Sequence, residues 1–168
     1  MITTLSFDLD DTLWDPRSAL IAADKAQWFA LAQRYPDLAG RLTRDQIFVC
    51  RKQILTDTPS IMGDVTTLRI EVMYRLLVSL DIAPAEADES AKMAFEAFMA
   101  KRNDVILFPE TIPMLENVSK SYTVVAITNG NADVFKTEIG PYFDLSIRAD
   151  EAGIAKPDRG IFDLTWEK

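Results

Sequence analysis

The pattern of apolar and polar positions divides the chain into a short leading segment, a long helical block and a closing segment of mixed elements. Residues 3–8 form a short apolar run, which predicts a buried strand. From residue 17 to about residue 103, apolar side chains recur every three or four positions, as in amphipathic helices. This block predicts four helices, which begin near residues 17, 43, 65 and 84.

Two of these predicted helix starts carry local signals. Asp15 and Pro16 suit the cap and the first position of a helix. The sequence Thr-Arg-Asp-Gln from Thr43 fits a capping box, in which the threonine and glutamine side chains bind each other's backbone N–H groups. Helix therefore accounts for most of the chain between the leading and closing segments.

The closing segment has the pattern of a parallel sheet. Residues 109–121 predict a helix, and residues 122–127 form a continuous β-branched run typical of a strand buried on both faces. A turn, a short helix and a strand at residues 145–148 follow, and Asp158 can cap a last helix over residues 159–168. Strands that alternate with helices indicate an α/β fold, which the helical block interrupts after the first strand.

Composition restricts the compartment and the chemistry. The 168 residues are 48% hydrophobic, and the net charge of −8 argues against sequence-independent binding to nucleic acid or to an anionic membrane. No apolar run approaches the ~18 residues that span a bilayer. Cys50 is the single cysteine and no basic-plus-apolar leader is present, so we expect a cytoplasmic protein. The absence of histidine excludes histidine-based triads, proton shuttles and zinc sites.

Polar residues follow each of the three predicted strands. They are Asp8 and Asp10, then Thr128 and Asn129, then Lys156. Singly, each feature is more often a solvated turn, a cap or a surface cation. Because ligands bind beyond the carboxyl ends of strands in open parallel sheets, their order on three successive strands predicts one joint site.

Two other interpretations of the acidic cluster fit the sequence less well. A calcium loop of the EF-hand type requires an acidic or amide side chain, a glycine and a glutamate where Thr12, Leu13 and Ala19 stand. A glycoside hydrolase requires two carboxyl groups ~5 to 9 Å apart, which leaves Lys156 and the Thr-Asn turn without a role.

Phosphoryl transfer gives every one of these residues a role. Asp8 can attack phosphorus and form an aspartyl-phosphate, and Asp10 can exchange protons with the leaving oxygen and the attacking water. Thr128 and Asn129 can hold phosphate oxygens, and Lys156 supplies a positive charge. A magnesium ion (Mg²⁺) would offset the repulsion between carboxylates and phosphate.

Three ordered motifs resemble those of the haloacid dehalogenase superfamily, most of whose members are phosphatases. They are FDLDDTLW after the first strand, VVAITNG at the second and GIAKPD after the third. The resemblance implies that Asp8 is the nucleophile and Asp10 the acid and base. It also implies that Thr128 and Lys156 bind phosphate, and that Asp8 and the backbone carbonyl of Asp10 hold Mg²⁺.

The resemblance also implies a domain organisation and a substrate class. Residues 1–15 and 105–168 would form a Rossmann-like catalytic core, and residues 16–104 a helical cap. An acidic residue at position 10 favours phosphatases over dehalogenases, because a halide leaves without a proton. The motifs are similar to those of bacterial phosphatases that act on FMN and on a phosphorylated ribityl-pyrimidine precursor of riboflavin.

Substrate contacts in the cap are harder to assign. The candidates are Trp14, Trp28, Arg51 and Arg69. A tryptophan on a helix is more often a core residue, and an arginine on a helix more often lies on a solvated face. Trp14, at the entry to the cap, is the candidate for which contact and packing are about equally expected.

The sequence departs from the family pattern at its end. The family carries a fourth, acidic motif about two dozen residues after the lysine, and this sequence ends twelve residues after Lys156. We therefore expect an incomplete metal site and a C-terminally truncated core, with the first strand exposed and able to pair two copies as a homodimer. The alternatives are a phosphosugar mutase of the same superfamily and a truncated, non-catalytic fragment that only binds a ligand.

Overall fold

The computed structural model describes residues 1–38 and 41–165. The chain divides into two compact units. Unit 1 contains Met1–Leu20 and the segment from Arg102 onward, and unit 2 is Ile21–Lys101. Unit 1 contains a parallel sheet with helices and unit 2 is helical, so the predicted α/β fold is confirmed. The assignment of a catalytic core and a cap to segments of the chain stays a prediction.

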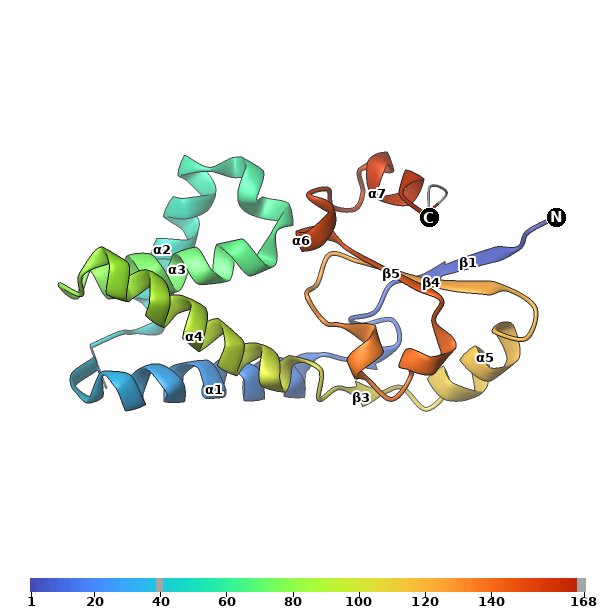
Figure 1. Cartoon of the computed structure of the whole chain (residues 1–168), viewed down its shortest axis with the longest axis horizontal. Coiled ribbons are helices and arrows are strands. Elements are labelled where there is room, and N and C mark those ends of the chain that lie inside the picture. The colour runs from blue at the N-terminus through green and yellow to red at the C-terminus, as the bar shows by residue number, and fades with distance from the viewer. Residues whose placement is uncertain (39–40, 166–168) are drawn as a thin grey trace. The chain divides into compact units, whose positions relative to one another are not determined.

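The sheet of unit 1 has three strands, β1 (Thr4–Phe7), β4 (Thr123–Thr128) and β5 (Leu145–Arg148), in the order β1-β4-β5. Both pairings are parallel, and their last matched residues are Phe7 with Ala126 and Thr128 with Arg148. Figure 1 shows the three strands side by side. Their carboxyl ends therefore meet at one edge of the sheet, which brings together the segments that follow them.

The central strand β4 is buried on both faces, as its β-branched sequence predicts. Successive side chains of a strand point to opposite faces, and β4 accordingly contributes to two hydrophobic clusters. The first contains Leu115 of α5 (Thr111–Val118), and the second contains Ile161 of α7 (Arg159–Asp163). Figure 1 shows these helices on opposite sides of the sheet. The result is a three-layer core.

Strand β1 lies at an edge of this sheet, in the exposed position that we expected for the first strand, and it is less buried than its apolar run predicted. Leu5 and Phe7 are half-buried, and Ser6 is exposed. Within the described residues β1 pairs only with β4, so one row of its backbone groups has no strand beside it. The sequence pattern of an apolar run cannot distinguish an edge strand from a central one.

Several short elements of unit 1 were not predicted. Strands β2 (Trp14–Asp15) and β3 (Ile106–Leu107) form an antiparallel pair, and α6 (Ala149–Ala152) follows β5. Two short 3-10 helices, Val134–Lys136 and Gly140–Tyr142, replace the single short helix expected after β4. The predicted last helix is present as α7, with Asp158 accepting from the N–H of Gly160 as its cap, and its predicted end lies outside the described residues.

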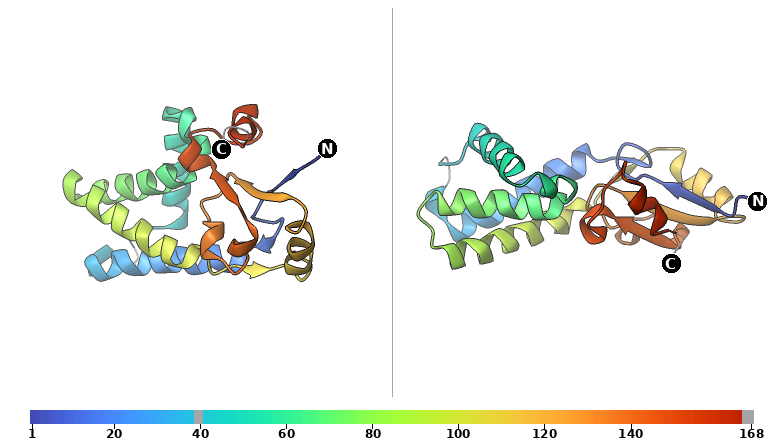
Figure 2. Two further views of the ribbon diagram at one scale, coloured as in Figure 1. Left: turned by 45° about the vertical axis from the view of Figure 1, so that its right-hand side comes forward. Right: turned by 90° about the horizontal axis from the view of Figure 1, so that it is seen from above.

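The helical block contains the four predicted helices, α1 (Arg17–Arg34), α2 (Arg44–Asp57), α3 (Val65–Val78) and α4 (Pro84–Arg102). The capping box at the start of α2 is confirmed, since Thr43 and Gln46 exchange hydrogen bonds of 2.8 and 3.2 Å. Beyond the end of α1, Tyr35 bonds Glu86 and Ser90 of α4. Helices α3 and α4 run side by side in Figures 1 and 2 and share the core of unit 2.

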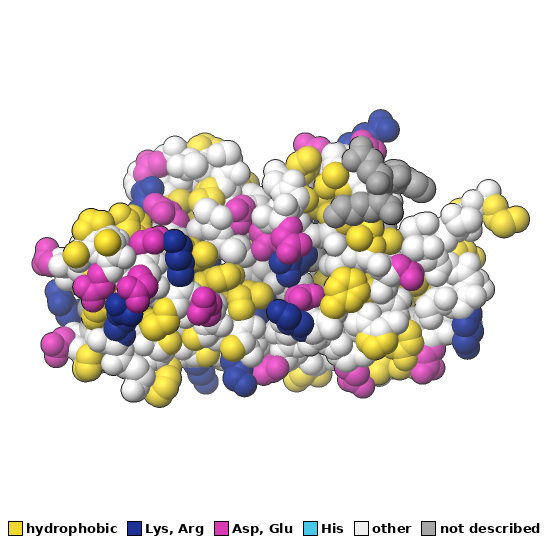
Figure 3. Space-filling view, in the orientation of Figure 1, with side chains coloured by type: hydrophobic (Ala, Val, Ile, Leu, Met, Phe, Trp, Pro, Cys, Tyr) yellow, Lys and Arg dark blue, Asp and Glu magenta, His cyan; other side chains and the backbone are white. Residues whose placement is uncertain are grey.

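The surface carries charges of both signs. On the face in Figure 3, acidic and basic side chains are interspersed among apolar ones. Within the described part of the chain, none of the helices combines the length and apolar character that crossing a bilayer requires.

Candidate active site

Asp8 and Lys156 meet at the carboxyl edge of the sheet. Asp8 follows β1 directly, and Lys156 lies in the loop between α6 and α7. The lysine Nζ is 2.8 Å from Oδ1 of Asp8 and also donates to the carbonyl of Ile127 at 2.7 Å. The Asp8 side chain is 42% exposed, so its carboxylate is accessible to a small molecule. Two residues 148 positions apart thus form one charged pair at the strand ends.

Asn129 fixes the backbone of Lys156. The N–H of Lys156 donates to Oδ1 of Asn129 at 2.7 Å, and Nδ2 of Asn129 donates to the Lys156 carbonyl at 2.9 Å. These two bonds connect the turn after β4 to the loop that carries the lysine. Both polar ends of the Asn129 side chain are therefore engaged, and its predicted role as a phosphate ligand stays a prediction.

Asp10 is held by two donors. The indole N–H of Trp14 donates to Oδ1 at 2.7 Å, and Nη2 of Arg102 donates to Oδ2 at 2.5 Å. The Asp10 side chain is 25% exposed, whereas that of Arg102 is 2% exposed and Trp14 is fully buried. The carboxylate therefore has a fixed orientation and one accessible side. Trp14, a candidate for substrate contact, holds Asp10 instead.

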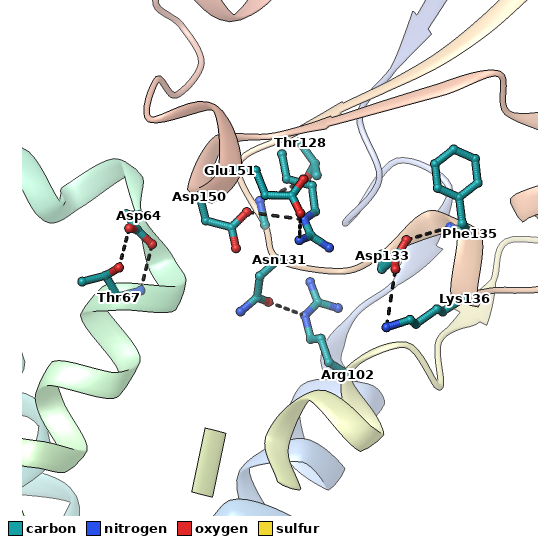
Figure 4. A network of polar contacts seen from close by, with 12 residues as sticks. Asp64, Thr67, Arg102, Thr128, Asn131, Asp133, Phe135, Lys136, Asp150 and Glu151 are labelled. Atoms are coloured by element: carbon teal, nitrogen blue, oxygen red, sulfur yellow. Dashed lines mark hydrogen bonds and ion pairs between the residues drawn. The ribbon is translucent and has the colours of Figure 1, made fainter. Parts of the chain in front are cut away.

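Arg102 is a site residue that sequence reasoning missed. It ends α4, and its Nε donates to Oδ1 of Asn131 at 3.1 Å, as Figure 4 shows. Its Nη1 is buried without a hydrogen-bond partner among the described residues. Arginines are common in the last turn of a helix because the helix dipole favours a cation there, so this position carries no sequence signal of burial.

Gly130 brings Asp10 and Thr128 close together. A β-carbon added to Gly130 would lie 2.6 Å from Oδ2 of Asp10 and 3.3 Å from Oγ1 of Thr128. The N–H of Gly130 donates to the Thr128 hydroxyl oxygen at 3.0 Å, which leaves the hydroxyl proton available for another acceptor. The structure therefore brings Asp8 to Lys156, and Asp10 to Thr128.

The end of the third strand carries a charge cluster of its own. Arg148 ends β5, and its Nε lies 3.4 Å from Oδ1 of Asp150. Its Nη2 also pairs with Glu151, and Figure 4 shows both carboxylates beside the strand end. This arginine is neutralised by α6 and adds little net positive charge to the strand ends.

The donor groups at Asp8 fit Mg²⁺ only if a phosphate shares the ion. Within the described residues, no three histidine, cysteine, aspartate or glutamate side chains are placed to hold a metal. Mg²⁺ in phosphoryl-transfer sites is bound by one or two carboxylates, several waters and the substrate phosphate. The accessible carboxylate of Asp8 is sufficient for Mg²⁺ bound in this way. A metal bound by protein side chains alone would require further side-chain ligands.

The remaining candidates, Trp28, Arg51 and Arg69, line one cavity within unit 2. Trp28 also packs against the core of that unit, as the commoner interpretation predicts. Arg69 is not on a solvated face, because it pairs with Asp24 at 2.6 Å and its side chain is 24% exposed.

Comparison with protein families identifies the family of the chain. The model of the family described as "haloacid dehalogenase-like hydrolase" matches residues 2–168. The chain belongs to this hydrolase family. The predicted family is therefore confirmed, and the three motifs that suggested it lie at the carboxyl ends of β1, β4 and β5 or in the loops that follow them.

Relatives of this hydrolase include both phosphatases and dehalogenases. It is 29% identical over 167 residues to the 5-amino-6-(5-phospho-D-ribitylamino)uracil phosphatase YigB of Escherichia coli K12, covering 99% of this chain and 70% of that protein. The crystal structure of 2-haloacid dehalogenase from Pseudomonas syringae pv. tomato DC3000 is 36% identical in sequence to this chain, with a TM-score of 0.91, over 99% of this chain and 72% of that one.

A second similar structure supports the fold alone. It is the magnesium-bound putative hydrolase YfnB of Bacillus subtilis, which is 16% identical with a TM-score of 0.60, over 99% of this chain and 72% of that one.

Proposed function

We propose that this hydrolase is a phosphomonoesterase in which Asp8 is the nucleophile. A carboxylate oxygen of Asp8 attacks phosphorus, the bond to the substrate oxygen breaks, and an aspartyl-phosphate forms. Water then attacks the phosphorus of this intermediate, which releases inorganic phosphate and restores the carboxylate. The exposure of Asp8 at the strand ends supports this role, because the attacking oxygen must reach the substrate.

Asp10 is the proposed acid and base. Because it accepts hydrogen bonds from Arg102 and Trp14, it is oriented as a carboxylate that can take a proton from the attacking water. In the next cycle that proton goes to the leaving oxygen of the substrate. Arg102 and Trp14 are positioning residues in this scheme, since they contact Asp10 and not the reacting atoms.

Lys156 and Thr128 are the proposed phosphate ligands. The Lys156 ammonium group already lies against Asp8, where the phosphate must arrive. The Thr128 hydroxyl can donate its proton to a phosphate oxygen, because its own oxygen accepts from Gly130. Asn129 contributes by fixing the lysine backbone.

The charge balance at the site favours the binding of Mg²⁺ together with substrate. Two carboxylates, Asp8 and Asp10, are paired with two cations, Lys156 and Arg102, so the four side chains are close to neutral. A phosphate dianion that approaches them requires further positive charge. Bound Mg²⁺ would supply that charge and polarise the phosphoryl oxygens. Asp8 and the backbone carbonyl of Asp10 are its proposed ligands.

The observation that carries the phosphatase proposal is the held carboxylate of Asp10. An alkoxide leaving group requires a proton and a halide does not. A proton donor fixed beside Thr128 and two residues from the nucleophile therefore assists the departure of the leaving group in phosphate-ester cleavage and not in dehalogenation. The similarity to the Pseudomonas syringae structure favours 2-haloacid dehalogenation as the second candidate.

The proposed substrate is a small phosphorylated metabolite in the cytoplasm. The similarity to the Escherichia coli phosphatase supports phosphorylated ribityl compounds as the first class to test, with FMN as a second. Association of two copies through the exposed edge of β1 is compatible with this activity but is not required for it.

The test measures phosphate release from p-nitrophenyl phosphate and FMN, and chloride release from 2-chloropropionate, with Mg²⁺ or with EDTA. We expect Mg²⁺-dependent phosphate release, and loss of at least 1,000-fold in Asp8→Asn, because an amide is a poor nucleophile (an effect on the order of that for removing a catalytic group). Chloride release without phosphate release would establish the dehalogenase instead.

Asp11→Asn is the matched control. Asp11 is exposed and has a φ of 58°, a conformation that asparagine tolerates as well as aspartate. This variant should retain full activity. A loss equal to that of Asp8→Asn would contradict the assignment of the nucleophile.

A further inference from the structure

Unit 2 contains a cavity of about 640 Å³ between three of its helices. One face of each helix lines it, because the lining residues recur at helical spacing. They are Ile21, Asp24, Lys25, Gln27 and Trp28 of α1, Arg44, Ile47 and Arg51 of α2, and Arg69, Val72 and Met73 of α3. All of them belong to unit 2, so the cavity does not depend on the residues around Asp8.

The apolar part of this cavity is continuous with the core of unit 2. Trp28, Ile47, Val72 and Met73 line the cavity and also pack in the hydrophobic cluster of the unit. One wall of the cavity is therefore apolar, is held in place by core packing and includes the aromatic ring of Trp28. Its volume lies within the ~300–1,000 Å³ range of small-molecule binding sites, which are typically lined by apolar and aromatic side chains.

The polar part of the cavity is positively charged. Lys25, Arg44 and Arg51 are exposed, and none of these three side chains has an ion-pair partner among the residues that the structure describes. Arg69 is paired with Asp24 and lies 3.8 Å over the ring of Phe98, which fixes its position. In a chain of net charge −8, this concentration of unpaired cations around an apolar wall favours an anion.

Gln27 provides a second, independent indication of a ligand. Its side chain is almost completely buried, at 1% exposure, and Nε2 donates to the sulfur of Met73 at 3.4 Å. Its Oε1 is buried and has no hydrogen-bond partner among the described residues. Buried acceptors are nearly always satisfied in folded proteins. The unsatisfied Oε1 is therefore a place where a ligand N–H or O–H group can bind.

We propose that this cavity is a binding site for a planar organic anion that carries an N–H or O–H donor. The ring of the ligand packs on Trp28 and the aliphatic wall, and its donor binds Oε1 of Gln27. Its carboxylate, sulfonate or phosphate group lies near Lys25, Arg44 and Arg51. The site is separate from the reaction at Asp8 and stands whether or not that residue is the nucleophile.

The first experiment uses the full chain and two dyes. The probe 1-anilinonaphthalene-8-sulfonate has aromatic rings, one N–H donor and one anionic group, and N-phenyl-1-naphthylamine lacks only the anionic group. We expect the anionic dye to bind at least tenfold more tightly. It should shift the NMR signals of the Trp28 indole N–H and the Met73 methyl group. Equal affinity of the two dyes, or shifts confined to other residues, would overturn the proposal.

Variants distinguish the contribution of the cations to binding from that of the unsatisfied Oε1 of Gln27. Arg44→Gln combined with Arg51→Gln should weaken the anionic dye at least tenfold and leave the neutral dye unchanged. Lys52→Gln is the matched control, because Lys52 is an exposed cation beside Arg51 that does not line the cavity, and it should bind both dyes as the wild type does. Gln27→Leu should weaken the dyes without lowering the melting temperature. Unchanged binding in the double variant would contradict the site.

Asp8→Asn distinguishes this site from the proposed phosphatase. That variant should bind the anionic dye with wild-type affinity even though it releases no phosphate. Loss of dye binding in Asp8→Asn would show that the dye occupies the site at the strand ends, and the inference about unit 2 would fail while the phosphatase proposal remained.

Discussion

At the scale of single residues, Gly130 occupies the position where three side chains of the proposed active site meet. A β-carbon there would lie 2.6 Å from the Asp10 carboxylate, 3.2 Å from Arg102 and 3.3 Å from Thr128. Gly130→Ala should therefore displace Asp10 and lower kcat by about 100-fold, as a shift of about 1 Å in a catalytic group can do. Steady-state kinetics with p-nitrophenyl phosphate measure this effect.

Gly153→Ala is the control for that substitution. Gly153 has a φ of 68°, and a β-carbon there would meet no atom within 4 Å. The left-handed conformation should cost roughly 1 kcal/mol of stability with alanine, with activity unchanged. If Gly130→Ala behaved like Gly153→Ala, with lower stability and full activity, the position of Asp10 would not matter for the reaction.

Arg102 should stabilise the fold as well as orient Asp10. Arg102→Met leaves the Asp10 carboxylate without its buried partner, which costs about 3–5 kcal/mol for a fully buried pair. We expect the lower end of that range, because the Asp10 side chain is 25% exposed. Urea denaturation measures the loss, and a double-mutant cycle with Asp10→Asn measures the share that comes from the pair.

Lys92→Met, on the same helix, gives the comparison for Arg102. Lys92 pairs with Asp88 on the surface, with both side chains more than half exposed, and such pairs contribute about 0.5 kcal/mol or less. Equal losses in the two variants would mean that burial adds nothing to the pair of Arg102 and Asp10.

The candidate site could be predicted only in part from single residues. Strand ends and motif order predicted that Asp8, Asp10, Thr128 and Lys156 lie at one edge of the sheet, and the structure brings Asp8 to Lys156 and Asp10 to Thr128. The buried partner Arg102 gave no such signal, because its contact with Asp10 spans 92 positions and depends on how α4 ends. Long-range contacts of this kind are set by tertiary packing and leave no local pattern.

At the scale of elements, the long helices and the strands of the parallel sheet were predicted, whereas the two-residue strands and the 3-10 helices were not. The start of α2 at Thr43 and the strand β5 were located from caps and composition. The pair of β2 and β3 was missed, because two residues cannot show a period. The edge position of β1 was expected, whereas the half-burial of Leu5 and Phe7 is lower than the apolar run predicted.

The link between the β4 turn and the Lys156 loop should control catalysis more than stability. Asn129→Ala removes both bonds to the Lys156 backbone, so the lysine should lose its fixed position at Asp8. We expect kcat to fall by about 10- to 100-fold, with a smaller change in KM. Measurements of kcat and KM on the same phosphorylated substrate provide the test.

Asn103→Ala removes a comparable bond elsewhere in unit 1, where Oδ1 of Asn103 accepts from the N–H of Asp133 at 2.9 Å. This variant should lose similar stability and keep its kcat. An equal fall of kcat in both variants would assign Asn129 a general structural role and not the positioning of Lys156.

At the scale of the whole molecule, paired carboxylates make the free energy of unfolding depend on pH in the acid range. The Arg17 guanidinium beside Asp15 lowers the pKa of that carboxyl from 3.8 to about 2, and hydrogen bonds from Gln53 and Arg75 lower the pKa of Asp57. A carboxyl group whose pKa is lower in the folded state than in the unfolded state stabilises the fold at pH values above its unfolded-state pKa. That contribution is lost as the pH falls from 3.8 toward 2.

The free energy of unfolding should therefore decline over this acid range, and most steeply at low salt, because both pairs are exposed and are screened by ions. Protonation of the carboxylates also leaves 18 lysine and arginine charges to repel one another. Denaturant titrations at several pH values measure the decline. In Arg17→Ala the pKa of Asp15 should return toward 3.8 while that of Asp57 stays unchanged, and an unmoved Asp15 would contradict the assigned cause.

The hydrogen bond from Trp14 to Asp10 has an optical consequence. An indole N–H that donates to a carboxylate has an excited state that depends on the charge of that carboxylate, so the emission of Trp14 reports events at Asp10 without an added label. Ligand arrival, proton transfer and the loss of Arg102 would each change this emission. Stopped-flow fluorescence can therefore follow single turnovers through Trp14 in a variant that carries both Trp28→Phe and Trp166→Phe, because the chain has three tryptophans.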